Sequence, residues 1–156
     1  MVAVEGADNP FNGVDVGTNA KPTFVDVDND GDMDAFVGNK VGNILYFKNT
    51  GSTTNPTFEE QMGTDNPFNG VDVGRYAAPT FVDVDSDGDL DAFVGNGGDG
   101  AILHFKNTGS ITNPTFVEQT GTDNPFNGVD VGDNATPTFI DVDNDGDMDA
   151  FVGDHL

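Results

Sequence analysis

The chain has 156 residues and a formal net charge of −23, with only five lysine or arginine residues against 28 aspartate or glutamate residues. Such an excess of acid excludes nucleic acid and anionic membranes as partners, because like charges repel. There is no cysteine, which excludes disulfide and thiol chemistry, and no apolar stretch is long enough to insert into a membrane. The length favours one domain or part of a repeat array.

A repeated unit accounts for nearly the whole chain. The segment D-N-P-F-N-G-V-D-V-G begins at Asp8, Asp65 and Asp123, so the unit is 57 or 58 residues long. The one difference in length lies near Asp99, which predicts an exposed loop tip there. Internal repetition with such a period is typical of solenoids and propellers.

The N-terminal stretch M-V-A-V-E-G-A aligns with F-V-E-Q-T-G-T, which precedes the third copy of the segment. It therefore predicts an outer strand of a blade. The stretch has neither a basic region nor an apolar core, so we expect no signal peptide within it.

Each unit predicts four short strands. In the first unit we expect them at residues 23–27, 33–38, 44–49 and 57–61, because runs of β-forming residues alternate with clusters of Gly, Asn, Pro and Asp. No window shows a helical period. The first and third strands carry apolar residues on both faces, as expected for a blade covered on both sides. We predict an all-β fold, a β-propeller of four-stranded antiparallel blades; a β-sandwich or a solenoid is the alternative.

The repeat predicts two complete blades and one split, partial blade. The predicted parts are an N-terminal outer strand with a connecting loop (1–20), blade 1 (21–63), a loop (64–78), blade 2 (79–121), a loop (122–136) and the first two strands of split blade 3 (137–156). Two blades cannot close a ring, and they would leave strand edges exposed. We expect self-association, with a homodimer of six blades favoured over a homotrimer of nine. The alternative is a fragment of a longer array.

A nine-residue line with five aspartates around a glycine lies between the first and second predicted strands of each unit. It reads D-V-D-N-D-G-D-M-D from Asp26 and returns at Asp83 and Asp141. Carboxylates this close repel one another unless a cation binds. Ca²⁺ suits a set of oxygen ligands, whereas Mg²⁺ loses its waters reluctantly and rarely takes an all-protein cage. We predict about three Ca²⁺ ions per chain.

The positions within the line predict how an ion is held. Side-chain oxygens are expected from positions one, three, five and nine, and a backbone carbonyl from position seven. Glycine at position six allows the sharp turn, while Val27 and Met33 should tie the loop to the core. An EF-hand is excluded, because its twelfth position needs Glu and here holds Val37. The candidate metal residues are Asp26, Asp28, Asp30, Asp32, Asp34, Asp83, Asp85, Asp87, Asp89, Asp91, Asp141, Asp143, Asp145, Asp147 and Asp149.

The motif P-T-F-V-D-V-D-x-D-G-D-x-D-A-F-V-G-N, followed by I-L-x-F-K-N-T-G, resembles the FG-GAP/VCBS repeat family. The resemblance implies Ca²⁺-binding propeller blades similar to those of integrin α-subunit heads, fungal integrin-like lectins and large bacterial surface proteins. Its ligand positions correspond to Asp26, Asp28, Asp30 and Asp34 in the first copy. It also implies an extracellular or cell-surface location and an adhesion or carbohydrate-binding role, although the family shares no single function.

The segment D-N-P-F-N-G-V-D-V-G is expected to connect one blade to the next, anchored by Phe11, Phe68 and Phe126. We interpret it as an ordered connection, and a ligand-contact loop is the alternative. It lies on the face opposite the acidic lines. Arg75 and Tyr76, at a variable position just after it, are the candidates for contact with a glycan.

The sequence contains no nucleophile–base pair, phosphate loop or zinc spacing, so we expect no enzyme. His104 stands where the first unit has Tyr46, which predicts a residue on a strand face. The predicted function is a non-enzymatic Ca²⁺-binding propeller module in which the ions stabilise the strand-to-strand loops. The alternatives are a purely structural, self-assembling repeat scaffold, natural or designed, and an accessory domain of a polysaccharide-active enzyme.

Overall fold

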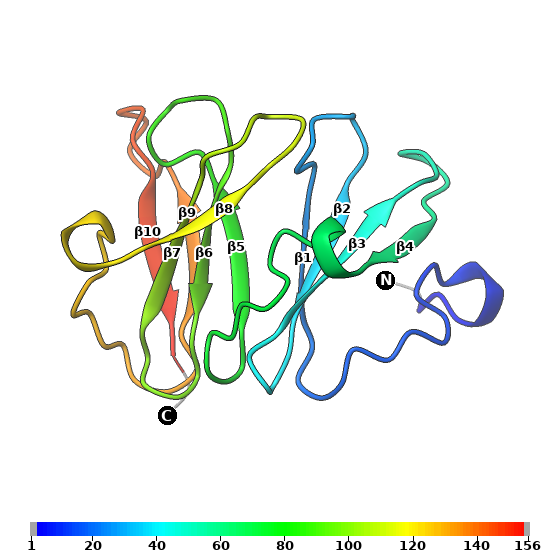
Figure 1. Ribbon diagram of the computed structural model, residues 1–156, viewed down its shortest axis with the longest axis horizontal. Coiled ribbons are helices and arrows are strands. Elements are labelled where there is room, and N and C mark those ends of the chain that lie inside the picture. Colours follow the sequence, from blue (N-terminus) through cyan, green and yellow to red (C-terminus); the bar gives the residue numbers. More distant parts are fainter. Residues whose placement is uncertain (1–2, 155–156) are drawn as a thin grey trace.

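The computed structural model describes residues 3–154 as a row of three β-sheets (Figure 1). Two sheets have four antiparallel strands and the third has two. The strands are β1 (Lys21–Val25), β2 (Asp34–Gly38), β3 (Ile44–Asn49), β4 (Phe58–Gln61), β5 (Ala78–Val82), β6 (Asp91–Gly95), β7 (Ile102–Asn107), β8 (Phe116–Gln119), β9 (Thr136–Ile140) and β10 (Asp149–Gly153).

The strands follow one another in chain order within each sheet, as propeller blades require. The strands predicted for the first unit differ from β1–β4 by two residues or fewer at either end. The first strands β1, β5 and β9 lie next to each other, so successive sheets are stacked side by side. We refer to the three sheets as blade 1, blade 2 and blade 3.

Three short 3₁₀ turns, η1 (Gly6–Asp8), η2 (Gly63–Asp65) and η3 (Gly121–Asp123), begin the connecting segments. No helix in the part of the chain that the structure describes is long and apolar enough to cross a membrane.

The predicted N-terminal outer strand is not formed over residues 3–5; Met1 and Val2 lie outside the described residues. An outer strand needs the edge of a third strand, as β4 needs β3. Within residues 3–154 the third sheet contains only β9 and β10. Among these residues, the N-terminal segment therefore has no third strand of that sheet with which to pair.

The connecting segments are anchored as predicted. The Phe68 ring is 2% exposed and lies between the blades, with its centroid 5.8 Å from that of Phe36 and 6.2 Å from that of Phe81. The Asn66 side-chain amide donates a hydrogen bond to the carbonyl oxygen of Ile44 at 3.0 Å. These contacts support the interpretation of the segment as an ordered connection.

The backbones of neighbouring blades approach closely at glycines that end the second strands. A Cβ atom added to Gly38 would lie 2.1 Å from the carbonyl oxygen of Ala77, and one added to Gly95 would lie 2.0 Å from that of Ala135. The Ala77 N–H donates a hydrogen bond to the carbonyl oxygen of Asn39 at 3.0 Å. A side chain at either glycine would force the blades apart.

Gly38→Ala should therefore lower the free energy of unfolding by about 1–3 kcal/mol, the usual cost of overpacking. Gly98→Ala is the control, because Gly98 is exposed in the loop after β6. Its added Cβ would meet only the side-chain oxygen of Asn96, at 3.1 Å. Urea unfolding of both variants checks this. Equal losses of stability would contradict the close approach of blades at Gly38.

Candidate metal sites in the acidic loops

Each acidic line forms the hairpin loop between the first and second strands of a sheet. We call these acidic loop 1 (residues 26–34), acidic loop 2 (83–91) and acidic loop 3 (141–149). The ninth aspartate of each loop pairs with the last residue of the preceding strand, as Asp34 does with Val25. This pairing fixes the width of the loop, so the intervening carboxylates are confined to a small volume.

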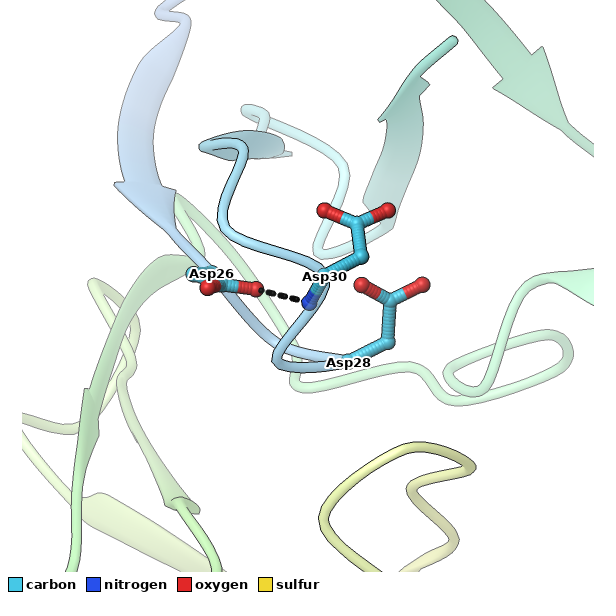
Figure 2. A group of neighbouring side chains, drawn as sticks. All are labelled: Asp26, Asp28 and Asp30. Atoms are coloured by element: carbon cyan, nitrogen blue, oxygen red, sulfur yellow. Dashed lines mark hydrogen bonds between the residues drawn. The ribbon is translucent and has the colours of Figure 1, made fainter. Parts of the chain in front are cut away.

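Acidic loop 1 gathers three carboxylates. Asp26, Asp28 and Asp30 each offer an oxygen, and these oxygens all lie within 4.8 Å of one another. Figure 2 shows the Asp28 and Asp30 carboxylates pointing the same way, with the Asp26 carboxylate held against the backbone nitrogen of Asp30. The Asp26 carboxylate accepts hydrogen bonds from the N–H groups of Asp30, at 3.1 Å, and Gly31, at 3.0 Å. The backbone thus orients the first ligand position.

The turn geometry is the same in all three loops. The glycine at position six has φ values of 92°, 92° and 97° at Gly31, Gly88 and Gly146, as the sharp turn predicts. Position four is also left-handed, with φ of 56–61° at Asn29, Ser86 and Asn144. The sequence reasoning missed this second left-handed residue. The signal was asparagine at position four of loops 1 and 3, because asparagine tolerates this conformation.

Acidic loops 2 and 3 each gather three carboxylates as well, loop 2 from the same positions as loop 1 and loop 3 from a different set. The carboxylates of Asp83 and Asp141 accept hydrogen bonds from the N–H groups of positions five and six, as that of Asp26 does. The second group comes from positions one, three and five, whereas the third comes from positions one, three and nine. The members are Asp83, Asp85 and Asp87 in loop 2, and Asp141, Asp143 and Asp149 in loop 3.

Six predicted ligands lie outside these groups. They are Asp32, Asp89 and Asp147 at position seven, Asp145 at position five, and Asp34 and Asp91 at position nine. The N–H groups of the position-seven residues donate to the position-five carboxylates, which helps to close each turn. Coordination through their carbonyl oxygens stays a prediction.

In the four-stranded blades the ninth aspartate also accepts hydrogen bonds from the third strand. Asp34 is fully buried, and its carboxylate accepts hydrogen bonds from the Tyr46 hydroxyl at 2.9 Å and the Asn49 N–H at 2.7 Å, both from β3. Burial raises the pKa of Asp34, while these hydrogen bonds act against the rise. In blade 3, which has two strands among the described residues, Asp149 instead joins the carboxylate group. Metal coordination by Asp34 and Asp91 stays a prediction.

Blade 2 lacks one of these hydrogen bonds. His104 lies on the face of β7, as predicted, and its ring stacks on Phe93 with centroids 4.4 Å apart. Its Nε2 atom is 4.0 Å from Oδ2 of Asp91, and both buried atoms are without a hydrogen-bond partner. Oδ1 of Asp91 still accepts from the Asn107 N–H at 2.8 Å. The substitution of histidine for tyrosine thus leaves half of a buried carboxylate unsatisfied.

Two lysines from the third strands contact the acidic loops. The ammonium of Lys48 contacts Asp28 and lies 3.4 Å from Oδ2 of Asp30. Lys106 contacts loop 2 in the same way through Asp85. Hydrogen bonding to Asp28 raises the pKa of Lys48. No lysine within residues 3–154 forms an ion pair with acidic loop 3.

The sequence reasoning did not assign these lysines to the loops. The available signal was the repeated F-K-N run at the same strand position in both complete units.

Val27 and Met33 have different surroundings, although both were expected to tie acidic loop 1 to the core. Val27 is buried, as predicted, but Met33 is 56% exposed. The expectation for Met33 was wrong: its repeat equivalent Met148 is exposed too, at 46%, although blade 2 packs against blade 3, so this loop position stays accessible even where a blade is adjacent.

Arg75 and Tyr76 lie between blades at the end opposite the acidic loops. Arg75 is exposed, whereas Tyr76 is half-buried and left-handed, with φ of 52°. The Lys40 ammonium lies 5.9 Å from the centre of the Tyr76 ring, and the Tyr76 N–H donates to the Lys40 carbonyl oxygen at 3.2 Å. These contacts give Tyr76 a role in joining the blades. A glycan contact by this pair stays a prediction.

Comparison with known proteins gives one family. Residues 26–94 and 83–152 match the model of a family described as FG-GAP-like repeat. The two matches overlap and together span all three acidic loops. No curated protein and no solved structure matches the chain.

His104→Tyr should raise the free energy of unfolding by about 1 kcal/mol, the usual net value of a buried hydrogen bond. The new hydroxyl would donate to Oδ2 of Asp91 as Tyr46 does to Asp34, in exchange for the longer contact of 3.3 Å between Nδ1 of His104 and the Asp123 carbonyl oxygen. Urea unfolding at one fixed pH in chelator measures the change.

The reverse exchange in blade 1, Tyr46→His, is the matched control and should cost a similar amount. A His104→Tyr variant less stable than the wild type would contradict this account of the unsatisfied Asp91 carboxylate.

Proposed function

Because the chain belongs to the FG-GAP-like repeat family, we propose that it is a calcium-binding module, with one Ca²⁺ bound by each acidic loop. The observation that carries the proposal is the recurrence of three carboxylate groups, one per sheet, with oxygens within 4.8 Å of one another. A cation among each group would relieve their mutual repulsion.

The chemistry of the donors fits Ca²⁺. The groups are made entirely of carboxylates, the hard oxygen ligands that Ca²⁺ takes six to eight at a time. In acidic loop 1, Oδ1 of Asp28 is buried and has no hydrogen-bond partner, as expected of an atom that serves as a ligand. Loop carbonyls and water would complete the coordination sphere.

We assign the ions a structural role. Each acidic loop joins the first two strands of a sheet, so a bound ion would hold together the end of one strand and the start of the next. Three Ca²⁺ ions would also reduce the formal net charge from −23 to −17. We infer a binding module and not an enzyme, because the clustered carboxylates are then occupied as ligands.

Calcium titration should show three ions per chain and a large rise in thermal stability. A ligand that binds only the native state adds about 2.7 kcal/mol per site at 100 times its Kd. Asp26→Asn, Asp83→Asn and Asp141→Asn should each remove about one ion in native mass spectrometry. Asp99→Asn, at the exposed loop tip, is the control and should leave three. A melting temperature that chelator does not change would contradict the structural role.

Lys48→Met should tighten calcium binding at acidic loop 1, because the ammonium of Lys48 competes with the ion for Asp28 and Asp30. The Lys48 side chain is 34% exposed, so we expect a gain of less than tenfold, as for other exposed ion pairs worth up to about 1 kcal/mol. Lys40→Met, at the opposite end of the blade, is the control. Calorimetric titration that shows weaker binding in Lys48→Met would contradict the competition.

We place this module outside the cell or at its surface, where calcium is millimolar. Calcium sites in extracellular modules typically have a Kd of about 10⁻⁴–10⁻³ M. Adhesion or carbohydrate binding is the biological task that we infer. It is supported by a hollow of about 560 Å³ on blade 1, lined by the exposed amides of Asn43 and Asn69 among other polar groups. Glycan-array binding that is lost in Asn69→Ala tests this role, and the absence of any bound glycan would contradict it.

A further inference from the structure

The same blade-to-blade contact occurs twice within the chain. In the first contact, the Phe36 ring of β2 packs on Phe81 of β5, with centroids 4.6 Å apart and planes at 45°. In the second, the Phe93 ring of β6 packs on Phe139 of β9, at 4.7 Å and 41°. The connecting phenylalanine completes each cluster; for Phe126 the centroid lies 5.6 Å from that of Phe93. The contact is therefore a reproducible property of this repeat.

One half of this contact is exposed at the blade 1 end of the row. We call it the head face and define it by Phe11, Phe24, Met33 and Phe58, which line an apolar hollow of about 360 Å³ together with Pro10, Asn49, Thr53 and Pro56. Phe24 is 52% exposed. Its repeat equivalents are the rings that receive Phe36 and Phe93.

The head face already has the geometry of the occupied contacts. The Phe11 and Phe24 ring centroids are 6.2 Å apart, with planes at 66°. The equivalent pair that receives Phe36 is 6.2 Å apart at 69°, and the pair that receives Phe93 is 6.1 Å apart at 70°. The receiving surface is therefore preorganised, which lowers the entropic cost of binding.

The other half is exposed at the blade 3 end. We call it the tail face and define it by Phe151 and Gly153 of β10. Strands β2, β6 and β10 share the sequence D-A-F-V-G; all five residues are buried in β2 and in β6, and none is buried in β10. Phe36 and Phe93 are 0% exposed, whereas Phe151 is 49% exposed. Phe151 pairs with the middle residue of β9 in the same register as its equivalents, so β10 presents it in the same way.

We propose that the head face and the tail face are two halves of one interface, through which copies of this chain dock head to tail. Phe151 of one copy packs against Phe11 and Phe24 of the next. Gly153 of the first copy then lies against the backbone of Ala20 in the next, just as Gly38 lies against the backbone of Ala77 within the chain. A second copy is the occupant because this chain makes the same contact with itself twice. The two faces differ, so the interface is heterologous and must close into a ring or extend. We expect closure as a dimer.

Charge opposes this association, because each copy carries a net charge of −23. Salt at physiological strength screens exposed charges beyond about 8 Å. The interface itself is apolar and aromatic and does not require bound metal. The test is therefore made at physiological salt, both with and without calcium, so that failure of calcium binding and failure of docking are separate results.

Sedimentation velocity of the full chain should give twice its mass of 16.4 kDa. Phe24→Glu and Phe151→Glu should each weaken self-association more than tenfold. Both side chains are about half exposed in the single chain, so the variants should keep the circular dichroism of the wild type. Val117→Glu is the matched control: Val117 is 46% exposed, and blade 1 already has Glu59 at this position. It should remain a dimer.

Mixing the two variants distinguishes the head-to-tail arrangement from a symmetric one. Each variant keeps one intact face, so an equimolar mixture should form a heterodimer that neither variant forms alone. A sharp trimer that is lost in the same variants would also support the interface. A wild-type monomer at all concentrations would overturn the proposal, as would dimers that survive both substitutions or a mixture that stays monomeric.

Discussion

Repulsion between carboxylates held within 4.8 Å of one another is the constraint that the surrounding structure must answer. The hairpin pairing of Val25 with Asp34, repeated in each sheet, prevents the loop from spreading to separate these charges. Three kinds of group oppose the repulsion: backbone N–H donors within the loop, a lysine from the third strand, and the cation that we propose. The first two are visible in the structure. They leave the Asp28 carboxylate with a buried, unpartnered oxygen.

The third strand of a blade therefore supplies hydrogen-bond donors and a positive charge to the acidic loop. In blade 1 it supplies the Tyr46 hydroxyl and the Asn49 N–H to Asp34, and the Lys48 ammonium to Asp28 and Asp30. Loop charge and blade assembly are coupled through these contacts. Blade 3, with two strands among the described residues, shows the loop without them, and there the ninth aspartate turns to the other carboxylates.

Much of this architecture could be predicted from the sequence. The repeat length, the four strands of a unit and the hairpin position of the acidic loops follow from local patterns, because turn residues and β-forming runs act within a few residues. The inward turn of Asp34 and the reach of Lys48 could not be predicted in this way. Both depend on the register between β2 and β3, which brings together side chains 12 and 20 residues apart. Met33 was misjudged because it lies within the acidic loop at the end of the blade, where its repeat equivalent Met148 is exposed as well.

The sequence D-A-F-V-G, shared by β2, β6 and β10, shows that stability also depends on contacts beyond the local sequence. Its three copies have one sequence and one hairpin register, yet two are buried and one is not. Burial of this strand depends on the third strand of its own blade, whose Tyr46 or His104 ring stacks on the phenylalanine, and on the neighbouring blade. Fully burying a phenylalanine side chain contributes about 1.5–3 kcal/mol, so Phe151, which is 49% exposed, lacks part of this stabilisation. The free energy that stabilises each blade therefore depends on its neighbour. The two ends of the row, with Phe151 exposed at one and the Phe11 and Phe24 rings at the other, are the surfaces that we propose to dock.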